Sequence, residues 1–173
     1  MGTFTFCYLK PHLIRDGGAG ILKEIIQDNG FQIVHESMKN LSIEDVMGIY
    51  PHIQELYPDD FQNTETVLSS LSGPSNFMVL WHENEAAAKT LRKLIGFPKY
   101  PDNPEGEGLR GIYALGRYQN AIHGSDSERL AIREIKTCFS EAIEAILSND
   151  YWKDEFYLAL ERAYAREQEI KLK

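Results

Sequence analysis

Two side chains in the last third of the sequence, His123 and Glu134, have the types and spacing that catalysis or anion binding requires. His123 lies in the segment Asn120-Ala-Ile-His-Gly-Ser-Asp-Ser127, after an apolar pair and just before a glycine and a predicted helix start. An imidazole there ends a strand beside helix N-terminal amides, which favour anions. Glu134 falls at the edge of the apolar face of that helix. A carboxylate in that position needs a partner, which Ser125 or the imidazole can supply.

A structural role is the alternative for each of these residues. A lone histidine at the end of a strand usually serves packing, and His123 differs because Ser127 and Glu134 accompany it at helical spacing. The other histidines have no such neighbours, and we expect them at surface or packing positions: His12, His35, His52 and His82.

Hydrophobic spacing predicts the elements that hold these residues. Strands are expected over 3–10, 31–38 and 77–81, and a short one is expected to end near His123. Helices are expected over 21–29, 42–49, 64–71, 86–95 and 125–146, the last opened by a capping box from Ser125 to Glu128. Residues 72–74 are expected to form a turn, and 96–111 a long irregular loop. This order predicts a ferredoxin-like βαββαβ sandwich of the α+β class, with a helical insert after the second strand.

The chain is predicted to divide into a domain over residues 1–147 and a helical extension over 148–173. Aromatic and apolar residues recur four apart in the extension, at Trp152, Phe156, Leu160 and Tyr164. We expect this extra C-terminal helix to pack on its own domain or on a neighbouring subunit. A dedicated partner-binding helix is the alternative.

The composition is that of a folded globular protein. Of 173 residues, 43% are apolar and 25% are charged, which argues against disorder. The net charge of −8 argues against binding duplex DNA through bulk charge, so we expect no nucleic-acid partner. Two cysteines, Cys7 and Cys138, are too few for a disulfide framework. No signal peptide or membrane span is evident, and we therefore expect a cytoplasmic protein without membrane contact.

The segment 120–127 resembles the active-site signature of nucleoside diphosphate kinases. The resemblance extends over residues 3 to about 139 through several motifs in the same order as in that family. They are a first strand ending in Lys-Pro (3–11), a glycine-hinged helix (18–25), Ser72-Gly-Pro74, the helix segment 89–96 and Gly108-Leu-Arg-Gly111.

The resemblance implies a kinase that moves the γ-phosphate of a nucleoside triphosphate such as ATP to a nucleoside diphosphate. The transfer would be a ping-pong reaction through a phosphohistidine at His123, since a neutral imidazole is a good nucleophile near pH 7. It also implies Mg²⁺ carried on the nucleotide phosphates, without a metal site on the protein. Nucleoside di- and triphosphates would be the partners, and the protein would be a homo-oligomer (a hexamer, tetramer or dimer).

By position, the resemblance assigns four catalytic residues and a nucleotide-binding set. His123 is the nucleophile, Glu134 and Ser125 orient its ring, and Lys10 contacts phosphate and sugar hydroxyls. Asn120 matches a ribose-contacting residue, and Phe61 is the candidate for stacking on the base. The nucleotide-binding set is Lys10, Tyr50, Phe61, Arg92, Pro98, Arg110 and Asn120. Tyr57 lies close to Tyr50, and spacing in this region differs from the common family pattern.

Several features depart from the common family pattern, and two of them, an insertion before Asn120 and the C-terminal extension, resemble divergent members of the family, some found in cilia. Pro98 replaces a threonine that commonly contacts phosphate, and proline has neither hydroxyl nor N–H. The segment 115–120 is about two residues longer than in housekeeping forms. A catalytically weak nucleotide-binding or structural module, docking a partner through the C-terminal helix, is therefore the alternative function. A small-molecule regulatory domain of the same fold, with no role for His123, is a third reading.

Overall fold

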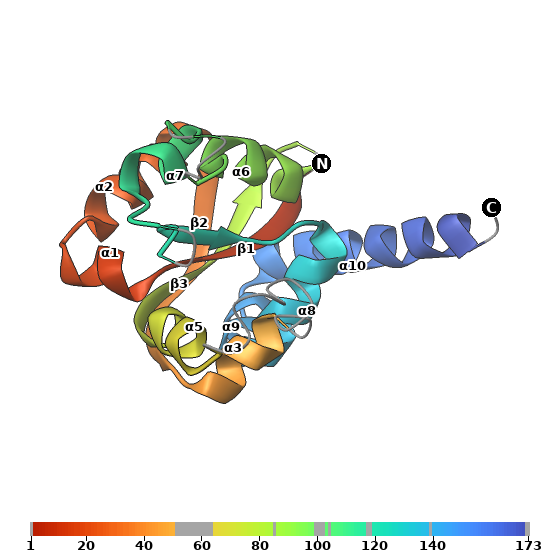
Figure 1. The fold of residues 1–173 in the computed structure, drawn as a ribbon. Helices are drawn as coiled ribbons and strands as arrows, with labels where there is room; N and C mark the ends of the chain where they lie inside the picture. Colours follow the sequence, from red (N-terminus) through yellow and green to blue (C-terminus); the bar gives the residue numbers. More distant parts are fainter. Residues whose placement is uncertain are drawn as a thin grey trace.

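Four antiparallel strands form one sheet, in the order β2-β3-β1-β4, in the computed structural model of the chain (Figure 1). The strands are β1 (Thr3–Leu9), β2 (Phe31–Leu41), β3 (Gly73–His82) and β4 (Ile122–Gly124). The structure describes residues 2–50, 64–84, 86–98, 103, 105–116, 119–138 and 140–171. The predicted ferredoxin-like α+β fold is confirmed.

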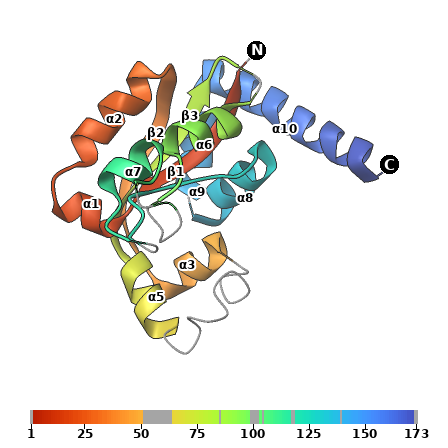
Figure 2. The same cartoon turned by 45° about the horizontal axis from the view of Figure 1, so that its top comes forward.

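Helices cover both faces of the sheet and give it two hydrophobic cores (Figures 1 and 2). On one face lie α1 (Pro11–Arg15), α2 (Ala19–Asp28), α6 (Ala87–Ile95) and α7 (Gly108–Tyr113). On the other lie α3 (Ile43–Ile49), α5 (Thr64–Leu71), α8 (Glu128–Cys138), α9 (Ser140–Leu147) and α10 (Asp150–Lys171). The pair α3 and α5 is the helical insert expected after the second strand.

Strand β1 is central to both cores because its side chains alternate between the faces. Phe4, Phe6 and Tyr8 point into the core under α8 and α10, while Cys7 and Leu9 point into the opposite one. Every residue of β1 is buried. The strand therefore fixes the position of Lys10, the residue that follows Leu9, between the two hydrophobic cores.

Two expectations about the chain after α5 are wrong. The strand β3 begins at Gly73, where a turn over 72–74 is expected from the sequence. It accommodates Pro74 because β1 ends opposite Asn76, so Pro74 has a neighbouring strand on the β2 side alone. The expected loop 96–111 ends earlier than predicted, because α7 begins at Gly108. The short strand expected to end near His123 is present as β4.

The predicted helix over 125–146 is two helices, α8 and α9, and its expected capping box is wrong. The Ser127 hydroxyl, not that of Ser125, accepts the bond from the Leu130 backbone N–H at 3.2 Å. Ser125 points instead toward Glu134. By contrast, Ser42 does cap α3, in a reciprocal capping box with Asp45.

The first half of α10 is part of the domain core. Phe156 is buried and meets Phe4 edge to face, with ring centroids 5.4 Å apart. Trp152 packs against Phe4 and Trp81, and the Trp81 indole N–H donates to Glu155 at 3.2 Å. The later turns of α10 extend away from the domain (Figures 1 and 2). Among the described residues, no helix is both long and apolar enough to span a bilayer.

Phe156→Ala is expected to lower the free energy of unfolding by about 3–5 kcal/mol, the usual loss when a buried aromatic side chain is truncated. Urea unfolding followed by far-UV circular dichroism measures it. Tyr157→Ala is the matched control, because Tyr157 is the next residue on the same helix and is 48% exposed. An equal loss in both variants would contradict the tethering of α10 through Phe156.

Candidate active site

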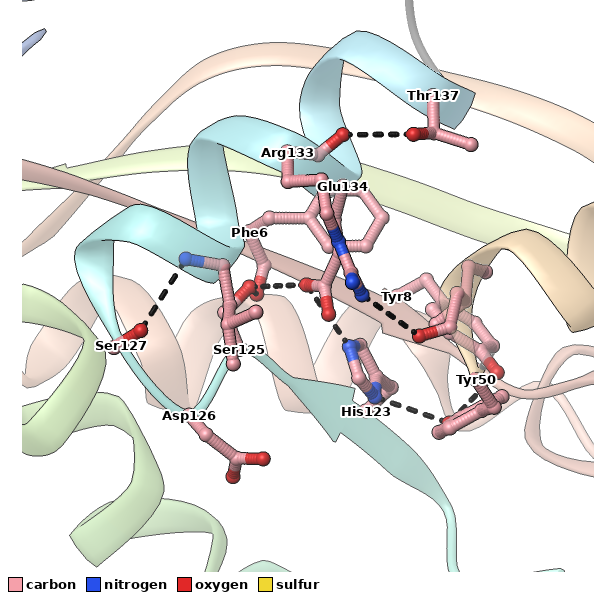
Figure 3. Close-up of polar contacts among 12 residues, drawn as sticks. Phe6, Tyr8, Tyr50, His123, Ser125, Asp126, Ser127, Arg133, Glu134 and Thr137 are labelled. Atoms are coloured by element: carbon pink, nitrogen blue, oxygen red, sulfur yellow. Dashed lines mark hydrogen bonds and ion pairs between the residues drawn. The ribbon is translucent and has the colours of Figure 1, made fainter. Parts of the chain in front are cut away.

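The imidazole of His123 is buried beside a carboxylate and a hydroxyl (Figure 3). It projects from β4, where His123 pairs with Tyr8 of β1. Its Nε2 lies 3.2 Å from Oε2 of Glu134 on α8. The Ser125 hydroxyl donates to the same carboxylate oxygen at 2.5 Å, and that carboxylate is itself buried. The structure thus joins three of the four residues expected to be catalytic through direct contacts, and the fourth, Lys10, lies nearby.

The other ring nitrogen of His123 faces a tyrosine. Tyr50, the C-cap residue of α3, places its hydroxyl 3.0 Å from Nδ1 (Figure 3). Because Nε2 faces an acceptor-only carboxylate, the ring proton belongs on Nε2 and the lone pair on Nδ1. Nδ1 then accepts from the Tyr50 hydroxyl. In this tautomer Nδ1 is the ring atom whose lone pair could attack an electrophile.

The surroundings of His123 keep its imidazole neutral. Burial lowers the pKa of His123 below its ordinary value of 6.5, and the positive charges of Lys10 and Arg110 lower it further. Glu134 acts in the opposite direction through its hydrogen bond and charge. The net shift is downward, so the ring carries a lone pair at neutral pH.

The protonation of His123 is expected to have its midpoint below pH 6.5, and Glu134→Gln is expected to move it lower still by removing the stabilising carboxylate. Ring-nitrogen NMR against pH measures both, with Glu141→Gln on the exposed face of α9 as the control. The unfolded chain takes up this proton at a higher pH than the native protein. The free energy of unfolding should therefore fall as the pH drops below about 6.5. A midpoint above 6.5 would contradict the assignment.

Two buried cations lie close to the imidazole. Lys10 directly follows β1 and is 2% exposed, and its backbone N–H donates to the Ala121 carbonyl. Burial lowers the pKa of Lys10 well below its ordinary value, and the charge of Arg110 adds to the shift. Two charges of one sign in a buried place favour an anionic ligand that neutralises both.

Arg110 on α7 also holds the strand that carries His123. Its Nε and Nη2 donate to the Ile122 carbonyl at 3.1 and 2.9 Å. The start of α7 lies close against the end of α6, where Gly96 and Gly108 have positive φ values of 69° and 57°. A Cβ on Gly96 would lie 2.2 Å from the Glu107 carbonyl oxygen. Gly96 and Gly108 therefore help to position Arg110.

The remaining nucleotide-binding candidates have different settings. Arg92 on α6 is half-buried and pairs with the exposed carboxylate of Asp126 at 3.2 Å. Asn120 is buried and lies two positions before the start of β4. Pro98 is also buried and lies shortly after the end of α6. Phe61 lies outside the described residues, as does Tyr57.

The backbone turn in front of β4 is strained, which the sequence does not reveal. Ala121 has a φ of 67°, and the Ile122 N–H donates to the Asn120 carbonyl at 2.8 Å. A three-residue turn with positive φ is a rare and strained conformation for a residue other than glycine. The bonds from Lys10 to Ala121 and from Arg110 to Ile122 brace it on either side.

Sequence reasoning missed two further residues of the site, Asp126, which pairs with Arg92, and Tyr8. Tyr8 hydrogen-bonds the Tyr50 hydroxyl at 3.1 Å, and its ring stacks on His123 with centroids 5.2 Å apart. A sequence signal for it did exist, because the alternation that places Phe4 and Phe6 in the core also places Tyr8 there. A buried tyrosine usually finds a partner for its hydroxyl.

Comparison with known proteins identifies relatives over most of the chain. The family model "Nucleoside diphosphate kinase" matches residues 3–143. Proteins of that name are similar at 34% identity in Histophilus somni strain 2336 (80% of this chain, 93% of the relative) and at 30% in Hydrogenovibrio crunogenus (79% and 92%).

Solved nucleoside diphosphate kinase structures also share this fold. That from Encephalitozoon cuniculi has a TM-score of 0.67 at 25% identity, with 79% of this chain and 88% of that chain covered. That from Aquifex aeolicus has a TM-score of 0.64 at 26% identity, with 81% and 96% covered. The family match spans both β1 with Lys10 and the segment around His123 and Glu134. This chain belongs to the nucleoside diphosphate kinase family.

Proposed function

We propose that the protein transfers the γ-phosphate of a nucleoside triphosphate, such as ATP, to a nucleoside diphosphate by a ping-pong reaction through phosphohistidine at His123. The arrangement of the His123 ring carries this proposal, with Nε2 against the Glu134 carboxylate and Nδ1 on the side of Tyr50 and Lys10. Such a ring is a neutral nucleophile of fixed orientation, and a covalent intermediate lets one site serve both nucleotides in turn.

In the first half-reaction, the Nδ1 lone pair forms a bond to the γ-phosphorus, and the bond from phosphorus to the bridging oxygen breaks. The electron pair leaves with the nucleoside diphosphate, and the positive charge gained by the ring is stabilised by Glu134 at Nε2. Ser125 holds that carboxylate in place. The second half-reaction is the reverse, with another diphosphate as acceptor.

The cations of the site would bind the phosphates. Lys10, Arg110 and Arg92 are the candidates, and Asn120 is the candidate for ribose. Phosphoryl transfer has little covalent chemistry for the protein to perform beyond the nucleophile, so positioning and charge neutralisation dominate. The buried positions of Lys10 and Arg110 support this role, because electrostatic stabilisation is stronger away from water.

Magnesium would be bound through the nucleotide phosphates and would neutralise part of their charge. Among the described side chains, no group of three or more His, Cys, Asp or Glu residues is placed to hold a metal ion. The cationic character of the site fits a metal that arrives on the nucleotide. Lys10, Arg92 and Arg110 would then contact phosphate oxygens that the metal leaves available.

Assembly into a homo-oligomer belongs to this proposal. The strand β2 is an edge strand of 11 residues, and Met38 on it is 57% exposed. A long edge strand offers unpaired backbone groups to another chain, and proteins usually cover such an edge. Light scattering of the purified protein measures the subunit number.

A nucleotide-binding module with little turnover is the second candidate. Pro98 is the observation that favours it, because a proline has neither hydroxyl nor N–H and so cannot donate a hydrogen bond to a phosphate. In that case the distal turns of α10 would supply the docking element.

Intact-mass measurement after brief incubation with Mg²⁺ and ATP separates the two candidates. A ping-pong kinase gains about 80 Da, in an acid-labile form that peptide mapping places on His123 and that a nucleoside diphosphate discharges. Folded protein that binds nucleotide but gains no mass would support the binding module.

A further inference from the structure

The Tyr8 side chain joins the His123 site in two ways. Its ring lies between those of Phe77 and His123, with centroid distances of 5.1 and 5.2 Å and interplanar angles of 14° and 28°. Its hydroxyl lies 3.1 Å from that of Tyr50, which in turn lies 3.0 Å from Nδ1 (Figure 3). Tyr8 is fully buried.

The direction of these hydrogen bonds follows from the tautomer of His123. Nδ1 has a lone pair, so the Tyr50 hydroxyl donates to it. The Tyr50 oxygen then remains available as an acceptor, and the Tyr8 hydroxyl donates to that oxygen. A hydroxyl that accepts one hydrogen bond becomes a stronger donor in the next, because the bonds of a chain polarise one another.

The Tyr50 hydrogen must leave Nδ1 before that nitrogen attacks phosphorus. The transferring phosphoryl group would arrive at Nδ1 itself, and its oxygens are the nearest new acceptors. A rotation about the C–O bond of Tyr50 moves the hydrogen from Nδ1 to such an oxygen, provided that the Tyr50 oxygen stays in place.

We propose that Tyr8 is a positioning residue for phosphoryl transfer: its hydroxyl anchors the Tyr50 oxygen, so that the Tyr50 hydrogen turns from Nδ1 of His123 to the transferring phosphoryl group. This inference rests on the proposed function. Tyr8 suits the task because the strand register and the two stacked rings fix its position. The hydrogen bond from Tyr8 to Tyr50 is kept throughout, and no proton is transferred from one oxygen to another.

The test is Tyr8→Phe, which keeps the ring and its stacking but removes the hydroxyl. Rapid-quench measurement of His123 phosphorylation by Mg²⁺-ATP is expected to be about three- to tenfold slower, the effect of one hydrogen bond of ordinary strength. The ATP concentration for half-maximal rate should change less than twofold. Tyr113→Phe is the matched control, since Tyr113 lies in the opposite core.

A double-mutant cycle with Tyr50→Phe separates anchoring from packing, because Tyr8 has nothing to anchor once the Tyr50 hydroxyl is gone. We expect Tyr8→Phe/Tyr50→Phe to be as slow as Tyr50→Phe alone. A wild-type rate in Tyr8→Phe, or effects that multiply in the double variant, would overturn this inference while leaving the proposed function intact. Absence of phosphohistidine in the wild-type protein would overturn both.

Discussion

The His123→Gln variant is expected to retain nucleotide binding and to lose more than about 10⁴-fold in phosphoryl transfer, because removal of a nucleophile abolishes the covalent route. Glutamine keeps a polar side chain of similar reach but has no basic nitrogen that can bond to phosphorus. Coupled-assay turnover with ATP and a second nucleoside diphosphate measures the loss, and calorimetric titration with ADP measures the retained affinity.

His82→Gln provides the matched control for this loss. His82 ends β3 opposite Thr3, whereas His123 pairs with Tyr8 at the far end of β1. The turnover of the His82→Gln variant is expected to be within twofold of wild type. If His123→Gln still gained the phosphoryl mass, the nucleophile would be another residue even though the family is established.

Lys10→Met is expected to change activity and stability in opposite directions. Transfer should fall about 10²- to 10³-fold, as when one preorganised donor is removed from a charge-stabilising site. The thermal midpoint should rise by about 2–4 °C, the shift that ~1 kcal/mol gives in a chain of this length. The rise is expected because a buried charge beside Arg110 is replaced by an apolar side chain of similar length.

The sign of the stability change distinguishes a binding cation from a structural one. Burial depresses the pKa of Lys10 in the native state, so the charged form opposes folding at neutral pH. The control is Lys93→Met on the exposed side of α6, where neither activity nor midpoint should change appreciably. A lowered midpoint in Lys10→Met alone would mean that Lys10 stabilises the fold.

The fold was predictable because its signals are local and periodic. The alternation of Phe4, Phe6 and Tyr8 marks β1, and the apolar run 77–81 marks the buried part of β3. The helix α10 follows from apolar residues four apart. The assignment of His123 and Glu134 to one site follows from a strand end and a helix face that adjoin in sequence.

Other features depend on contacts between distant segments, which a single sequence does not encode locally. The helix α7 contains two glycines in six residues and has weak helical propensity, yet it forms where Gly96 and Gly108 let two backbones meet. The hydroxyl contact between Tyr8 and Tyr50 joins residues 42 positions apart. Ser125 has capping-box spacing, but a buried carboxylate is the stronger partner and leaves the cap to Ser127.

The two hydrogen bonds that Arg110 donates to the Ile122 carbonyl suggest which site residues would be lost first if a descendant of this protein lost its activity. A lineage released from selection for catalysis would discard Lys10 early, because that loss removes a buried charge and favours folding. Arg110 would persist long afterwards, because its removal leaves a buried carbonyl unpaired beside the strained turn at Ala121. In relatives that have lost catalytic activity, an arginine at this position would therefore indicate common descent and would not be evidence of activity.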